Sequence, residues 1–234
     1  MTTIAVPQHP GQTEAQAARS RSTLQRALLG SGILALVIYL TADVGGGLLY
    51  PGYRFSSHTI SELAAVGAPT AALVGPLFMM YPILELAFAA GVLREAAGWN
   101  RALRLSGIML IASSTLGIAS AWFPMQAPRG MGSLAADMPH IIVMSGIVLF
   151  LILSIGVGAF ALGRRFRIYS LATVLTVLVF GVLTGRYIAR VGAGDPTPGL
   201  GIIERIEVYA TLVWIAVLGI ALLRRPLHPS QPLP

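Results

Sequence analysis

The sequence predicts an all-α fold, an integral membrane bundle of six transmembrane helices. Hydrophobic residues make up 55% of the chain and charged residues 11%, against roughly 25% charged residues in an average soluble domain. Six apolar stretches are each near the roughly 20 residues that a helix needs to cross a bilayer. All 16 basic residues are arginine, and most of them lie at the ends of these stretches, as expected of membrane helices.

The predicted membrane domain covers residues 25–223, between two tails. Residues 1–24 are polar and have no apolar run of their own, which predicts a disordered cytoplasmic tail. The tail 224–234 contains four prolines and predicts irregular cytoplasmic structure. The predicted spans are about 27–49, 69–93, 102–122, 138–162, 169–188 and 202–223.

Arginine placement predicts the orientation of the bundle in the cell (inner) membrane. Eleven of the 16 arginines fall on the side of both termini: Arg19, Arg21, Arg26, Arg94, Arg101, Arg104, Arg164, Arg165, Arg167, Arg224 and Arg225. The positive-inside rule then places both termini in the cytoplasm. Since topology explains these arginines, the net charge of +7 does not indicate nucleic-acid binding. The absence of cysteine excludes disulfides and cysteine nucleophiles.

The connection from Tyr50 to Gly67 is long, polar and, in this orientation, outward-facing. Thr59 and Glu62 have the spacing of a capping box, which predicts a short extra helix from about Ile60 to Ala65. The aromatic side chains of the Tyr50–Gly67 connection suit the membrane interface. We expect this loop to fold back over the mouth of the bundle.

Most acidic residues, and both histidines outside the tails, also gather at the outer face, which topology does not explain. His58 and Glu62 are one helical turn apart, and so are Asp137 and His140. Two histidines and two carboxylates could hold zinc, but the same residues also suit a metal-free site or purely local roles in capping. The candidate ligand-binding residues are Asp43, Arg54, His58, Glu62, Asp137, His140, Arg186 and Glu204.

Ser61 is a candidate nucleophile in the same loop. His58 or His140 would act as its base, and Asp43 or Asp137 would orient that base. No Gly-x-Ser-x-Gly elbow surrounds the serine. The candidate catalytic residues are therefore His58, Ser61, Glu62, Asp137 and His140.

Two further groups of charged residues stand out. Arg186 and Arg190 end the fifth span, and Glu204 and Glu207 begin the sixth. A helical hairpin would bring them together, either as structural ion pairs or as an arginine pair that binds an anionic head group.

Glu85 lies inside the second span, where a carboxyl group must be neutral or paired. It suits proton or cation handling, or a hydrogen bond between helices to hydroxyls at the same depth: Ser113, Ser114, Ser154 and Thr176.

Several short motifs together resemble an uncharacterised multi-span membrane family, domain of unknown function 998. The motifs are Tyr50-Pro51-Gly52-Tyr53, Ser61-Glu62-Leu63, Phe123-Pro124 followed by His140, and Gly201-Ile202-Ile203-Glu204-Arg205. The resemblance covers about residues 27–223 and implies a compact bundle of about six helices, without an activity to carry over. Met125-Gln126 stands where members often have an aspartate after Phe-Pro, which weakens a metal or catalytic role for that loop.

Three classes of function remain open on the sequence alone. The favoured one is a binding protein whose outward polar pocket holds a lipid head group, a small ligand or a membrane protein partner. The second is a membrane-embedded hydrolase that acts on lipid-like substrates through His58, Glu62, Asp137 and His140, with or without zinc. The third is a proton-coupled carrier that uses Glu85.

Overall fold

The computed structural model describes residues 10–97, 100–126 and 133–225, and the side chains from residue 22 onward. Within these ranges the chain is helical, without strands. The long helices are α1 (Pro10–Leu49), α2 (Ala71–Glu95), α3 (Arg101–Ala119), α4 (Leu134–Gly158), α5 (Arg164–Gly185) and α7 (Leu200–Leu223). The short ones are the 3-10 helices η1 (Ser61–Ala64) and η2 (Ser120–Trp122) and the helix α6 (Ile188–Ala193).

Six of these helical segments are long and apolar enough to cross a membrane, as the sequence predicts. Many large apolar side chains point away from the bundle, including Ile142, Leu149, Leu175 and Val182. A bundle that is apolar on its outside as well as its inside is typical of a protein surrounded by lipid.

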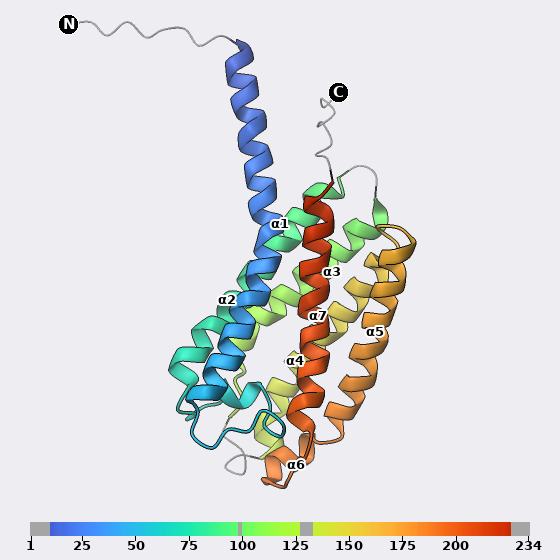
Figure 1. The fold of residues 1–234 in the computed structure, drawn as a ribbon. Coiled ribbons are helices and arrows are strands. Elements are labelled where there is room, and N and C mark those ends of the chain that lie inside the picture. Colours follow the sequence, from blue (N-terminus) through green and yellow to red (C-terminus); the bar gives the residue numbers. More distant parts are fainter. Residues whose placement is uncertain (1–9, 98–99, 127–132, 226–234) are drawn as a thin grey trace, which may run out of the picture.

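The six long helices form a closed ring (Figure 1). Each one packs on the next along the chain from α1 to α5, and α7 lies between α5 and α1. The start of α1 and the end of α7 point to the same end of the bundle, the termini end. The opposite end, the loop end, carries residues 50–70, 120–126 and 186–199.

Small residues allow the close helix packing. A Cβ on Gly91 of α2 would lie 3.1 Å from the backbone of Leu28 on α1, and one on Gly117 of α3 would lie 2.7 Å from Pro82. The main core fills the termini half around Leu29, Phe88 and Trp214. In lipid, such close backbone approach replaces the hydrophobic effect as the cause of helix association.

Several helices begin earlier than the sequence predicts. Helix α1 extends back to Pro10, where we expected a disordered tail. Residues 10–24 are rich in alanine, glutamine and arginine, which favour helix, and proline is tolerated in a first turn. Helix α4 begins at Leu134 because Ser133 caps it, accepting a hydrogen bond from Ala136 N at 3.2 Å. Of the two tails, residues 1–9 and 226–234 lie outside the described residues.

The Tyr50–Gly67 loop folds back onto the bundle, as predicted. Leu63 is fully buried against Ala42 and Val74, and Val66 N donates to Met125 O at 2.9 Å. The short helix in it is a 3-10 turn rather than the capped helix over 60–65 that we expected, and no side chain caps it. Glu62 is buried, and the backbone oxygen of Thr59 accepts a hydrogen bond from the Tyr53 hydroxyl.

Candidate functional site

Arg205, near the start of α7, forms hydrogen bonds with several segments at the loop end. Its Nε and Nη2 atoms donate to the two carboxylate oxygens of Asp43 on α1, at 2.9 and 2.7 Å. Nη2 also donates to the Tyr53 hydroxyl at 2.6 Å. Nη1 donates to the backbone oxygens of Phe55 and Gly201, both at 2.9 Å, and more weakly to His58 O at 3.2 Å.

These bonds use all five N–H groups of the guanidinium. Asp43 is fully buried and Arg205 is 8% exposed, so the pair is a desolvated, bidentate ion pair. Tyr209 of α7 donates a further hydrogen bond to Asp43. We call Asp43, Tyr53, Arg205 and Tyr209 the Arg205 cluster. Since its arginine has no donor left for a ligand, the cluster serves to join α1, the loop and α7.

Tyr53 links the loop to this cluster. Burial raises the pKa of Tyr53 well above its usual range, and the nearby Arg205 opposes this shift only in part. The hydroxyl therefore keeps its proton, which it donates to Thr59 O at 2.8 Å. The Arg205 guanidinium also lies over the ring of Phe55, 5.0 Å from its centre, which adds a cation–π contact.

The first turns of α7 hold the loop at two more points. Gly201 N donates to Ser56 O at 3.1 Å, and a Cβ on Gly201 would lie 2.3 Å from Phe55 O. Only glycine permits that approach. One turn later, the Glu204 carboxylate accepts from Ile60 N at 2.8 Å. Gly201, Glu204 and Arg205 thus explain why Gly-Ile-Ile-Glu-Arg occurs as a motif.

Ser61 and His140 form a second polar pair at the loop end. The Ser61 hydroxyl is 3.3 Å from His140 Nε2, and His140 Nδ1 is 2.9 Å from Phe123 O. A backbone oxygen can only accept a hydrogen bond, so Nδ1 carries the ring proton. Nε2 is then an acceptor, and the serine hydroxyl donates to it. Both side chains are partly exposed.

This arrangement is the pairing that a serine nucleophile and its base require. The group that orients the base is the Phe123 carbonyl, not the predicted aspartate. Asp43 is bound to Arg205, and the Asp137 carboxylate accepts from Gln126 N at 2.7 Å.

A family model described as "Protein of unknown function (DUF998)" matches residues 33–221. The chain belongs to the DUF998 family. The match includes every residue of the Arg205 cluster and both members of the Ser61–His140 pair, and it confirms the resemblance drawn from the motifs. Neither a curated protein nor a solved structure matches the chain.

In this DUF998 protein the two predicted pairs, His58 with Glu62 and Asp137 with His140, have separate surroundings. The His58 ring stacks on Tyr53, 5.2 Å between ring centres, and its Nδ1 accepts from Arg54 N at 2.9 Å. His140 instead contacts Ser61. Among the described residues, no three histidine, aspartate or glutamate side chains lie together as metal ligands would. The described residues therefore do not form a set of zinc ligands.

The predicted pairing of Arg186 and Arg190 with Glu204 and Glu207 is not found. Arg186 and Arg190 are exposed, and in the described part of the chain no ion pair joins either to a glutamate. Arg186 is the C-terminal cap residue of α5. Glu204 instead holds Ile60 N, and the Glu207 carboxylate lies against Gly181 of α5, 3.1 Å from where a Cβ would be.

Glu85 of α2 is 1% exposed in the middle of its span. Of the hydroxyls predicted to bond it, those of Ser113 and Ser114 lie close to the carboxyl group. Ser154 pairs with Ser106 at 2.9 Å instead, and Thr176 donates to Ala172 O within its own helix. Neither carboxylate oxygen of Glu85 has a partner in hydrogen-bonding geometry among the described residues, although the two serines lie near it.

Three residues of the Arg205 cluster were not among the site residues predicted from the sequence: Tyr53, Arg205 and Tyr209. One signal points to Arg205. An aspartate inside a span needs a cation, and Arg205 belongs to one of the motifs on which the resemblance was drawn. Tyr53 lies in another of the motifs that carry the resemblance, whereas Tyr209 had no such signal, because tyrosine is common at membrane interfaces.

Proposed function

We propose that this DUF998 protein is a membrane-embedded hydrolase of the acyl-transfer type, with Ser61 as nucleophile and His140 as general base. The observation that carries the proposal is the hydrogen-bonded series from Ser61 Oγ through the His140 ring to Phe123 O, at 3.3 and 2.9 Å. A polar binding pocket, the interpretation that the sequence favoured, has less support, because Asp43, Asp137 and Glu204 already bind groups of the protein itself.

The proposed reaction follows from the tautomer of His140, in which Nδ1 carries the proton and Nε2 can accept one. Ser61 Oγ attacks the carbonyl carbon of an ester while His140 Nε2 takes the hydroxyl proton. The tetrahedral intermediate then expels the alcohol, which leaves with that proton, and an acyl-serine remains. Water attacks this ester next, again giving its proton to Nε2, and releases the carboxylic acid with Ser61 restored. The Phe123 carbonyl holds the ring in place and stabilises its protonated form.

The surroundings favour a lipid-like substrate. Trp122, Phe123 and Met138 present exposed apolar side chains in the segments that lead to the imidazole. At the same end of the bundle, Arg54, Arg186 and Arg190 are exposed and offer charge to an anionic head group. An amphiphilic ester could thus approach from the membrane with its polar part at the loop end.

The orientation belongs to the same proposal. Eleven of the 16 arginines lie on the termini side, which supports cytoplasmic termini and an outward-facing loop end in the inner membrane. Reporter fusions after Arg104, Arg167 and Arg225 should be cytoplasmic, and fusions within 192–200 should be outside. An outside location of the C-terminal fusion would reverse the orientation.

A serine-reactive fluorophosphonate tests the proposed activity on detergent-purified protein. We expect a covalent adduct on Ser61 that is absent in Ser61→Ala and forms much more slowly in His140→Asn. Ser56→Ala is the matched control, since Ser56 is an exposed serine of the same loop. A hydroxyl that only ties the loop to α4 would not react. Absence of the adduct in the folded wild-type protein, or equal reaction in His140→Asn, would refute a catalytic pair.

A further inference from the structure

The interior of the bundle holds a carboxyl group that the proposed hydrolase does not use. Both oxygens of Glu85 are buried and have no hydrogen-bond partner, and the Ser113 hydroxyl on α3 is likewise buried without one. No arginine or histidine forms an ion pair with Glu85 among the described residues. An unpaired carboxylate in hydrocarbon is expensive and typically marks a site for an ion or a proton.

The groups around Glu85 are all oxygen donors. The hydroxyl groups of Ser113, Tyr81 and Ser114 lie near its carboxyl group. Ser114 donates its proton to Leu110 O at 2.6 Å, which leaves its oxygen lone pairs for another partner. One carboxylate with three hydroxyls supplies up to five oxygens and one negative charge. Hard monovalent cations suit such a set, while a divalent ion would retain excess positive charge in the apolar interior.

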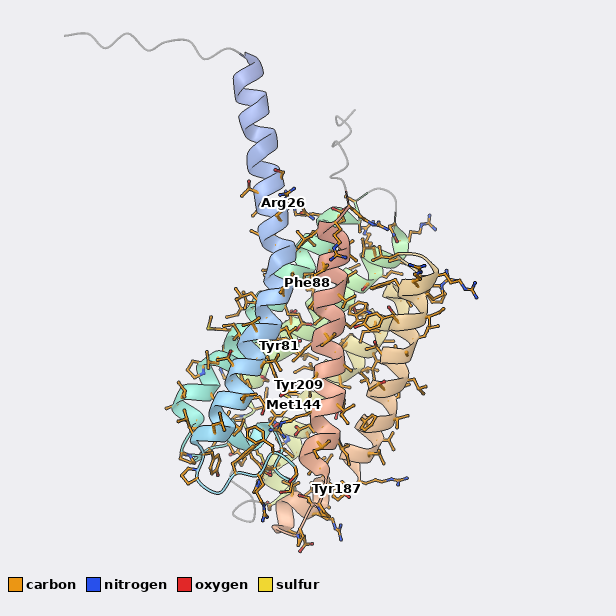
Figure 2. The ribbon with its side chains drawn as sticks, viewed as in Figure 1. Arg26, Tyr81, Phe88, Met144, Tyr187 and Tyr209 are labelled. Atoms are coloured by element: carbon orange, nitrogen blue, oxygen red, sulfur yellow. The ribbon has the colours of Figure 1, made fainter. Side chains whose placement is uncertain are left out.

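A line of tyrosines connects this position to the loop end. Tyr81 is on the same helix as Glu85, one turn nearer the loops, and its ring meets that of Tyr39 on α1 edge to face, with 5.3 Å between centres. Tyr39 in turn lies one helical turn before Asp43 of the Arg205 cluster on α1. Figure 2 shows Tyr81 and Tyr209 at successive depths of the bundle. These phenols lie between Glu85 and the loop end, where α1 also carries Asp43 and α7 carries Glu204, Arg205 and Glu207.

We propose that Glu85, Ser113, Ser114 and Tyr81 form an intramembrane cation site, in which a sodium ion exchanges with the proton of the Glu85 carboxyl group. With sodium bound, the carboxylate is neutralised by the ion and the Ser113 oxygen gains the partner that it lacks. With a proton bound, the acid is neutral. Either state removes the unpaired charge, and the site does not depend on Ser61 or His140.

Dicyclohexylcarbodiimide tests this proposal, because it adds across protonated carboxyl groups in apolar surroundings and leaves a stable adduct on the side chain. In the purified protein we expect labelling of Glu85, identified by mass spectrometry and lost in Glu85→Gln. Sodium chloride should slow the labelling relative to choline chloride at equal ionic strength. The reduction should be about tenfold at a sodium concentration ten times the apparent Kd, because labelling follows the sodium-free fraction.

The serines give a matched pair of variants. Ser113→Ala should weaken protection by sodium, whereas Ser106→Ala should leave it unchanged, since Ser106 is on the same helix but already bonded to Ser154. Equal labelling in sodium and in choline would overturn the cation site, and failure of Glu85 to react at any pH would overturn proton exchange as well. Because these variants leave Ser61 and His140 intact, either result is independent of the fluorophosphonate experiment.

Discussion

Replacing Arg205 with alanine should destabilise the protein strongly. The substitution leaves Asp43 fully buried, with Tyr209 as its one remaining hydrogen-bond donor among the described residues. Breaking a buried ion pair from one side costs about 3–5 kcal/mol. For a chain of this size, about 2–4 °C of melting temperature corresponds to each kcal/mol. We therefore expect thermal unfolding in detergent to shift down by about 6–20 °C.

Three variants make this measurement decisive. Arg186→Ala, which removes an exposed arginine, should change stability by no more than about 0.5 kcal/mol. Arg205→Lys keeps the charge but loses the planar fork, so its loss should be intermediate. Asp43→Ala with Arg205→Ala should cost less than the sum of the two single losses, because neither charge is left unpaired. Additive losses, or an Arg205→Ala protein as stable as Arg186→Ala, would refute the buried pair.

Two further predictions concern how the loop is held. Gly201→Ala should lower the melting temperature, because its Cβ would lie 2.3 Å from Phe55 O. Gly45→Ala in α1 should leave the melting temperature unchanged, since nothing lies within 4 Å of a Cβ there. Equal effects of the two variants would show that the loop can shift to accommodate the added methyl group. Burial raises the pKa of Tyr53 above the usual tyrosine value of about 10, so the stability that it contributes is complete below that pH and is lost as pH rises through the folded-state pKa. Tyr53→Phe should accordingly lose less thermal stability than wild type between about pH 8 and pH 11, and an identical loss would contradict this linkage.

Much of the fold could be predicted from the sequence because apolar length determines membrane helices almost directly. The six spans and the inward fold of the Tyr50–Gly67 loop follow from such local signals. The capped helix at Thr59 did not form, and the backbone there is instead bound at Ile60 by Glu204, which is distant in sequence. A local pattern cannot show that a remote side chain will bind the backbone of the segment.

The residues of the candidate site could be predicted from the sequence, but which histidine pairs with the serine could not. Ser61 and His140 were both candidates from their residue types, and His140 was one of two proposed bases. Which histidine meets the serine depends on how α4 is placed against the loop, and that is a tertiary fact. The orienting group could not be predicted at all, since the Phe123 carbonyl is a backbone atom that every residue possesses.

The ion pair between the first and last spans has a consequence for biosynthesis. Asp43 enters the membrane long before its partner exists, because 162 positions separate it from Arg205. At about 5–20 residues per second, translation leaves the carboxyl group waiting roughly 10–30 s. Throughout that interval the nascent chain carries an unmatched acid near the interface, where water or the insertion machinery must accommodate it. A chain interrupted before α7 would never neutralise it, so quality control could recognise incomplete copies by this one exposed carboxyl group.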